Sequence, residues 1–62
     1  MHPLSGGVAV ITGAASGFGL EVSRIAARLG MRIVMADVQA DALEAAASEV
    51  RGLGATVLPY RL

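Results

Sequence analysis

The apolar residues of this chain form two kinds of pattern, short unbroken runs and longer stretches with helical spacing. One unbroken run covers residues 8–11, and a second (RIVMA) covers residues 32–36 and stops at Asp37. Such runs predict strands buried on both faces, as in a parallel sheet. A third strand is predicted over residues 55–60, where Pro59 cannot donate to a central ladder, so we expect this strand at an edge.

Two helices are predicted between these strands. The first carries apolar residues at helical spacing: Phe18, Val22, Ile25, Ala26 and Leu29. Gly30 follows this stripe and suits the left-handed position that ends a helix. The second carries its own stripe: Leu43, Ala46, Ala47, Val50 and Leu53. Asp41 and Glu44 have the spacing of a capping box at its start, and Gly52 and Gly54 end it.

The predicted order is therefore β-α-β-α-β. Two strand–helix–strand units in succession imply right-handed crossovers and parallel strands in the order 3-2-1. The predicted fold class is α/β, a Rossmann-type three-layer parallel sheet of which this chain contains a truncated unit.

Composition suggests that this unit belongs to a larger domain. A chain of 62 residues with 55% hydrophobic residues, no cysteine and one histidine has neither disulfides nor a metal site to stabilise a small core. We therefore expect residues 1–62 to be the N-terminal part of a longer single domain. Residues 2–7 (HPLSGG) do not resemble a signal peptide, and the lack of cysteine is compatible with a cytoplasmic protein.

The charge distribution argues against several classes of partner. Five arginines balance five acidic residues, lysine is absent and the formal net charge is zero. Binding to nucleic acid or to a membrane surface needs clustered cations, so neither partner is expected. Dispersed carboxylates with one histidine predict no metal site. A phosphate-binding P-loop is excluded because its motif requires a lysine.

Three glycines lie where the first strand turns into the first helix, the place at which parallel α/β sheets bind ligands. Gly13 permits a tight turn, Gly17 lets the backbone approach a diphosphate, and Gly19 lets the helix pack closely on the strand. Free N–H groups at the helix start attract phosphate, and Ser16 adds a hydroxyl. The alternative is a glycine-rich turn that binds nothing.

Asp37 favours the first interpretation. It lies 24 positions after Gly13, close to the offset of about 20 residues at which an acid meets the adenosine ribose of a dinucleotide. Its carboxylate would accept from the ribose hydroxyls and repel a 2′-phosphate. The alternative is an acid that serves only a turn or a helix cap.

The segment TGAASGFG resembles the TGxxxGxG pattern of the short-chain dehydrogenase/reductase family, with Thr12, Gly13, Gly17 and Gly19 in register. The resemblance extends through VAVITG, RIVMAD and GATVLPYRL, and covers the first quarter of a typical member. Because residue 16 is serine, the TGxxGxxG spacing of the extended branch fits less well.

This resemblance implies an NAD(P)-dependent oxidoreductase that moves a hydride to or from an alcohol or carbonyl carbon. The residues implied on the diphosphate and nicotinamide side are Gly13, Ser16, Gly17, Phe18 and Gly19, and Asp37 is implied at the ribose. Many relatives carry Ile or Leu where this chain has Phe18. Members that prefer NADP often have a basic residue at the position of Ser16 or after that of Asp37; here Ser16 and Val38 favour NAD.

The family's catalytic pair, a tyrosine with a lysine four residues later, is absent. Only Arg61 and Leu62 follow Tyr60, so no catalytic residue is assigned and the chain alone is expected to be inactive. The parent is expected to be a homo-oligomer, and the free flank of the first strand predicts dimers or aggregates of the chain. A stand-alone nucleotide-binding module and a non-catalytic regulator that senses the NAD redox state remain alternatives.

Overall fold

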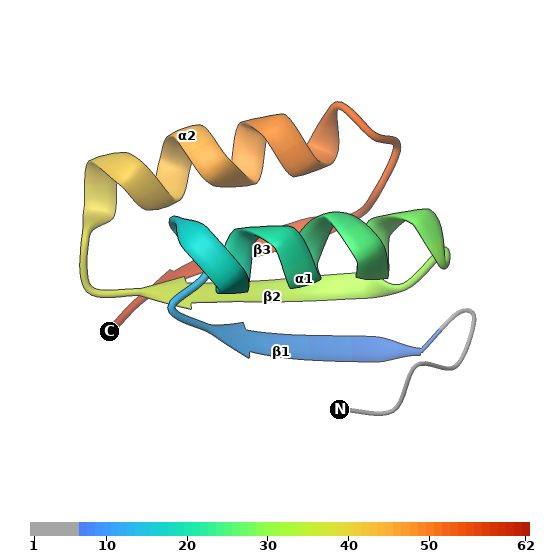
Figure 1. Cartoon of the computed structure of the whole chain (residues 1–62), viewed down its shortest axis with the longest axis horizontal. Coiled ribbons are helices and arrows are strands. Elements are labelled where there is room, and N and C mark those ends of the chain that lie inside the picture. Colours follow the sequence, from blue (N-terminus) through green and yellow to red (C-terminus); the bar gives the residue numbers. More distant parts are fainter. Residues whose placement is uncertain (1–6) are drawn as a thin grey trace.

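The computed structural model describes residues 7–62, so residues 1–6 and the interpretation of their sequence lie outside it. The described elements are β1 (Val8–Thr12), α1 (Gly17–Arg28), β2 (Arg32–Asp37), α2 (Ala40–Arg51) and β3 (Val57–Arg61) (Figure 1). The predicted order of strands and helices is confirmed.

The three strands are parallel and lie in the order β1-β2-β3, which confirms the predicted topology. Val10 pairs with Val34, and Val34 with Leu58, so these residues form one row across the sheet. As predicted, β3 lies at an edge, where Pro59 pairs with Met35. The strand begins at Val57 and continues beyond the proline to Arg61.

Both helices cover the same face of the sheet (Figure 1), because two right-handed crossovers that step in one direction place them there. α1 packs on β1 and β2, α2 packs on β2 and β3, and the helices touch each other. The core lies between these two layers. Its largest apolar side chains with less than 2% exposure, Met31, Ile33, Met35 and Val50, come from β2, its preceding turn and α2.

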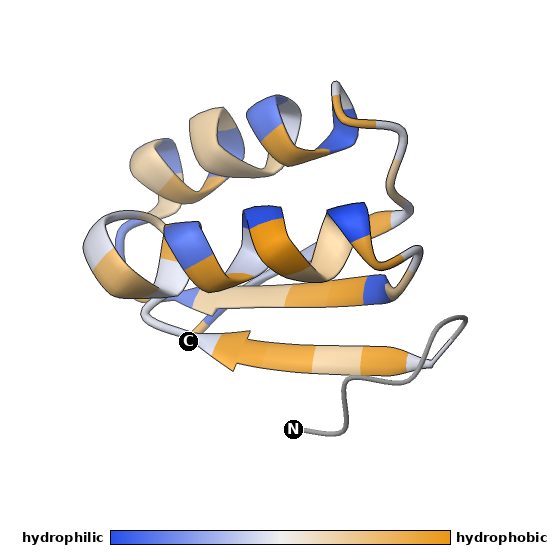
Figure 2. Ribbon diagram, turned by 45° about the vertical axis from the view of Figure 1, so that its right-hand side comes forward, coloured by the Kyte–Doolittle hydropathy of each residue, from blue (hydrophilic) through white to orange (hydrophobic). Residues whose placement is uncertain are grey.

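The opposite face of the sheet carries no helix of residues 7–62. Val8, Val10, Leu58 and Tyr60 are 55–64% exposed there, and Figure 2 shows β1 as a mostly hydrophobic strand beneath the helices. The prediction that β1 is buried on both faces is therefore wrong for the described residues, since its burial alternates. Of the three layers of the predicted fold, residues 7–62 form two.

The buried face of α1 differs from the predicted stripe. Ser23, Ala26 and Ala27 are buried, whereas Phe18 is 85% and Ile25 47% exposed. The fully buried residues of α1 therefore have small side chains, while Leu20 and Val22 are partly buried against the core. The predicted end is confirmed, because Gly30 follows α1 with a φ of +75°.

The predicted capping box of α2 is wrong. α2 begins at Ala40 with Gln39 as its N-cap, so Asp41 lies inside the first turn. The Asp37 side chain accepts a bond from the Gln39 N–H and so turns the chain two residues before the predicted cap. Leu53, predicted on the apolar stripe, lies beyond the helix and is 46% exposed.

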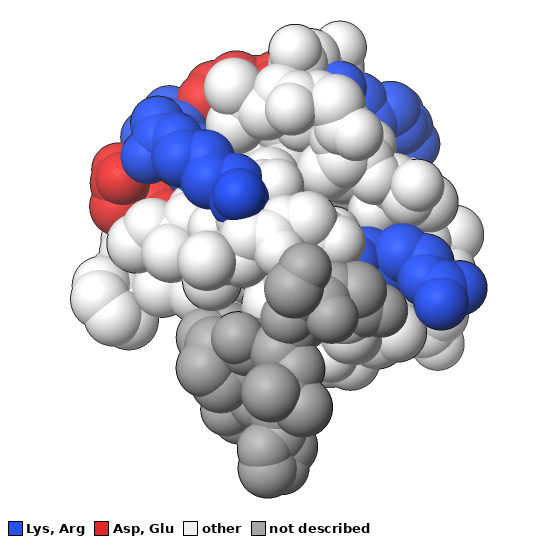
Figure 3. Space-filling model, turned by 90° about the vertical axis from the view of Figure 1, so that its right-hand side faces the viewer, with Lys and Arg blue, Asp and Glu red and all other residues white. Residues whose placement is uncertain are grey.

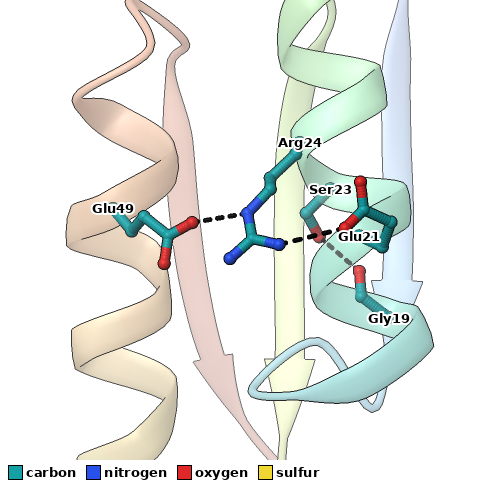
Figure 4. A network of polar contacts seen from close by, with 5 residues as sticks. All are labelled: Gly19, Glu21, Ser23, Arg24 and Glu49. Carbon is teal, nitrogen blue, oxygen red and sulfur yellow. Dashed lines mark hydrogen bonds and ion pairs between the residues drawn. The ribbon is translucent and has the colours of Figure 1, made fainter.

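Arg24 links the two helices on their solvent side. Its guanidinium donates to Glu49 of α2 and, at 3.0 Å, to Glu21 of its own helix (Figure 4). This bonding lowers the pKa of Glu49.

At the amino ends of the strands, Figure 3 shows basic side chains separated by uncharged surface.

Candidate functional site

The turn between β1 and α1 lies at the carboxyl ends of the strands. Gly13 and Gly17 adopt φ values of +64° and +57°, in the left-handed region that costs most other residues about 1–2 kcal/mol. The N–H of Ala14 donates to the carbonyl of Ala36 at 3.1 Å, which extends the β1–β2 pairing by one bond into the turn. The predicted need for glycine at both positions therefore has a conformational basis.

The first turn of α1 presents unpaired backbone donors. Its first intrahelical bond runs from the Leu20 N–H to the Ser16 carbonyl, so the N–H groups of Gly17, Phe18 and Gly19 have no partner within the helix. Ser16 makes no side-chain capping bond, and the first turn contains no acidic residue. Within residues 7–62, the partial positive charge of this helix end is therefore not neutralised by its own first turn.

Gly19 and Gly17 are glycines for different reasons. A Cβ on Gly19 would collide with the Gly13 carbonyl oxygen and would lie 2.6 Å from its carbon. The close approach predicted at Gly19 is confirmed, although its partner is the turn backbone rather than the strand. A Cβ on Gly17 would meet nothing within 4 Å, so the space above Gly17 is open.

Asp37 is 8% exposed and joins the turns that follow β1 and β2. Its Oδ2 accepts from the N–H of Ala15, and its Oδ1 from the N–H of Gln39, each at 3.0 Å. The bonds from Gln39 and Ala15, in that order, lower the pKa of Asp37, so the carboxylate is charged at neutral pH. The structure thus brings Asp37 and the glycine turn together, as the sequence predicted.

The sequence did not predict that the backbone N–H groups of Ala15 and Gln39 donate to Asp37. An N–H group carries no residue-specific signal, and only the position of Ala15 inside the glycine turn pointed toward it. The Gln39 bond shows that Asp37 serves a turn, as the alternative interpretation expected. This bond does not exclude the ribose role, which stays a prediction.

An open hollow of about 450 Å³ lies beside β1 and is lined by Val10, Ile11, Thr12, Phe18, Gly19 and Val22. Only β1 and α1 contribute to it, so it borders the edge of β1 opposite β2. The ring of Phe18, 85% exposed, lies at this hollow rather than in the core.

A family model described as short chain dehydrogenase matches residues 7–62. The chain is 55% identical over 49 residues to 1-deoxy-11-beta-hydroxypentalenate dehydrogenase of Streptomyces exfoliatus, covering 79% of this chain and 18% of that protein. It is 48% identical over 54 residues to galactitol 2-dehydrogenase (L-tagatose-forming) of Cereibacter sphaeroides, covering 87% and 20%.

Two solved structures show the same arrangement. A short-chain dehydrogenase/reductase of Burkholderia phymatum in complex with NAD superposes with a TM-score of 0.91 at 46% identity, covering 98% of this chain and 22% of that one. L-Sorbose reductase of Gluconobacter frateurii, complexed with NADPH and L-sorbose, gives a TM-score of 0.90 at 40% identity, covering 95% and 23%.

The fold and the glycine turn are those of a Rossmann-type nucleotide-binding unit. The chain belongs to the short-chain dehydrogenase/reductase family and corresponds to the N-terminal region with which its members bind their cofactor. It spans about one fifth of the length of the relatives it matches.

None of the helices among residues 7–62 is long and apolar enough to cross a membrane. That part of the chain also contains no group of three or more His, Cys, Asp or Glu side chains placed to hold a metal ion.

Proposed function

We propose that this chain binds NAD across the carboxyl ends of β1 and β2, as the cofactor-binding part of a dehydrogenase or reductase. When bound, the nicotinamide would accept or supply the hydride exchanged with an alcohol or carbonyl carbon. The residues proposed to contact NAD are Gly13, Ser16, Gly17, Phe18, Gly19 and Asp37.

The observation that carries this proposal is the open start of α1 beside a charged carboxylate. Free N–H groups of the first helical turn can bond to phosphate oxygens, and the helix dipole favours their negative charge. The space above Gly17, where a Cβ meets nothing within 4 Å, allows the phosphates to reach those N–H groups. Residues of this chain therefore fit the diphosphate.

Asp37 fits the adenosine ribose. A carboxylate has about four acceptor positions, and the bonds from Ala15 and Gln39 use one on each oxygen. Each oxygen therefore keeps an acceptor position for one of two neighbouring hydroxyls. Hydrogen bonds of this charged kind contribute about 1.5–3 kcal/mol each.

The preference for NAD over NADP also rests on Asp37. The similar solved structures include one with NAD and one with NADPH, so family membership does not select between these cofactors. In this chain the acceptor-only carboxylate would repel a 2′-phosphate, and neither Ser16 nor the exposed Val38 supplies a compensating positive charge.

Calorimetric titration of the chain with NAD and with NADP tests the proposal. We expect saturable binding of NAD and at least about tenfold weaker binding of NADP, which corresponds to about 1.4 kcal/mol. Tighter binding of NADP would refute the charge argument, and binding of neither nucleotide would refute the proposed function.

Hydride transfer itself needs groups that this sequence does not contain. The chain has one tyrosine and no lysine, so it cannot form the tyrosine–lysine pair implied by the family resemblance. We therefore propose that the chain binds cofactor without turning over substrate. The homo-oligomeric state of the parent protein and its cytoplasmic location stay predictions.

A further inference from the structure

The Asp37 side chain connects the glycine turn to the end of β2. Its two oxygens bond to backbone donors on two different loops, Ala15 after β1 and Gln39 after β2. The last backbone bond between these strands is the neighbouring one, from the Ala14 N–H to the Ala36 carbonyl. Beyond that bond, the Asp37 side chain provides the connection from the glycine turn to the end of β2.

The backbone of Asp37 is also bonded to the chain that follows β3, the strand on the other side of β2 from β1. Its own carbonyl accepts from the N–H of Leu62, just after β3, at 2.9 Å. Its backbone is therefore bonded to the end of one neighbouring strand while its side chain bonds to the turn after the other. A residue held in this way is a rigid support for the turn that begins α1.

We propose that Asp37 is a positioning residue that fastens the phosphate-binding turn to the end of β2, so that it raises the affinity for NAD and NADP alike as well as discriminating between them. This inference rests on the proposed function, because it assigns to that site the residue that preorganises it. It differs from ribose recognition alone in predicting that loss of Asp37 does not convert the site to NADP.

Two substitutions separate the roles of charge and of position. Asp37→Asn and Asp37→Ala both remove the negative charge that repels a 2′-phosphate. An asparagine keeps one accepting oxygen, whereas its NH2 group only donates, so one backbone bond is lost; alanine loses both. If charge alone matters, the two variants gain affinity for NADP to the same extent.

If Asp37 positions the turn, neither variant binds NADP more tightly than the wild type. The affinity for NAD falls about tenfold or more in Asp37→Asn, as expected for a lost bond to a charged group, and further in Asp37→Ala. Val38→Arg is the matched comparison, because it adds a cation at the exposed neighbouring position and leaves both Asp37 bonds in place. We expect Val38→Arg to gain affinity for NADP.

Hydrogen exchange of the nucleotide-free chain, resolved at single amides, tests the positioning directly. In Asp37→Ala the amides of Ala15 and Gln39 should exchange at least about tenfold faster, while the adjacent amide of Ala14 keeps its partner and its rate. Asp37→Asn should release one of the two amides. Asp41→Asn, the same change at an exposed acid of α2, should release neither.

The outcomes are distinct. Unchanged exchange at Ala15 and Gln39, equal acceleration at Ala14, or tighter NADP binding by both Asp37 variants would each overturn the positioning role. If Asp37→Ala does not fold, Asp37→Asn carries the comparison because it keeps one bond. If the wild type binds neither nucleotide, the proposed function fails, and the exchange experiment still decides whether Asp37 holds the turn.

Discussion

Gly19 in the first turn of α1 lies against the carbonyl group of Gly13, so close that a Cβ on Gly19 would be 2.6 Å from the Gly13 carbonyl carbon. This contact sets the distance between the start of the helix and the turn that precedes it. It therefore also sets where the free N–H groups of the first turn lie.

Gly19→Ala should destabilise the chain, although alanine is the better helix former by about 1 kcal/mol. Crowding a packed site typically costs about 1–3 kcal/mol, and here the obstacle is backbone, which cannot rotate away as a side chain can. The clash should therefore exceed the gain in helix propensity, and denaturant unfolding should show a lower midpoint.

Gly52→Ala is the comparison for this prediction. A Cβ there would meet the Glu49 carbonyl oxygen at 3.2 Å, a far milder contact. A Gly19→Ala variant as stable as Gly52→Ala would show that the turn can move away from the helix and that its position is not fixed by this contact.

Gly17→Ala should impair nucleotide binding more than folding. Gly17 and Gly54 both have positive φ, +57° and +92°, and a Cβ on either meets nothing within 4 Å. Each alanine should therefore cost stability through backbone strain, about 1–2 kcal/mol at the φ of Gly17 and no less at Gly54. Only Gly17 adjoins the proposed diphosphate position, so only Gly17→Ala should lose affinity for NAD, by about tenfold or more.

Paired titrations and unfolding curves of the two variants measure this difference. Equal NAD affinity in Gly17→Ala and Gly54→Ala would mean that the open space above Gly17 does not receive the phosphates.

The strands and helices could be predicted from the sequence because each apolar pattern follows one local period. The glycine turn and Asp37 were also predictable as neighbours, since the carboxyl ends of paired parallel strands meet at one edge of the sheet. The bond between Asp37 and Ala15 was not predictable, because it depends on the exact β1–β2 register, in which Thr12 pairs with Ala36.

The two incorrect predictions have identifiable physical causes. The spacing of Asp41 and Glu44 matches a capping box, yet the Asp37–Gln39 bond already starts the turn, and α2 begins before Asp41. The apolar run of β1 predicts burial on both faces, but the described residues supply a helix layer to only one. A local bond between residues two positions apart decided the first case, and the number of layers packed on the sheet decided the second.

Acid should destabilise the chain in part through Asp37. Its backbone bonds lower its pKa in the folded state below the ordinary value of 3.8. The unfolded chain then binds this proton more tightly, so the stabilisation is complete above about pH 5 and is lost as the pH falls through the folded pKa. Asp37→Asn should therefore lose less stability than the wild type between pH 5 and pH 2.

Unfolding free energies of both chains across that range measure the effect. Arg24 lowers the pKa of Glu49, so Glu49 contributes to the acid destabilisation in the same direction in both chains. The difference between the two pH profiles of unfolding free energy therefore reports the contribution of Asp37. Parallel pH profiles would contradict the assignment.

The uncovered face of the sheet should make the chain self-associate. Val10 and Leu58 are 64% and 62% exposed in the row that crosses the sheet through Val34, and β1 has a second edge without a partner strand among residues 7–62. Exposed apolar faces and unpaired edges both promote association. Sedimentation of the wild-type chain should show dimers or larger species.

Lysine at both positions, Val10→Lys with Leu58→Lys, should shift the chain toward monomer, because charge on this face opposes apolar contact between copies. Val38→Lys is the control, since Val38 is 63% exposed but follows β2 outside the sheet. It adds a lysine of similar exposure away from the face. A monodisperse wild-type monomer, or an equal shift by the control, would show that the uncovered face does not drive association.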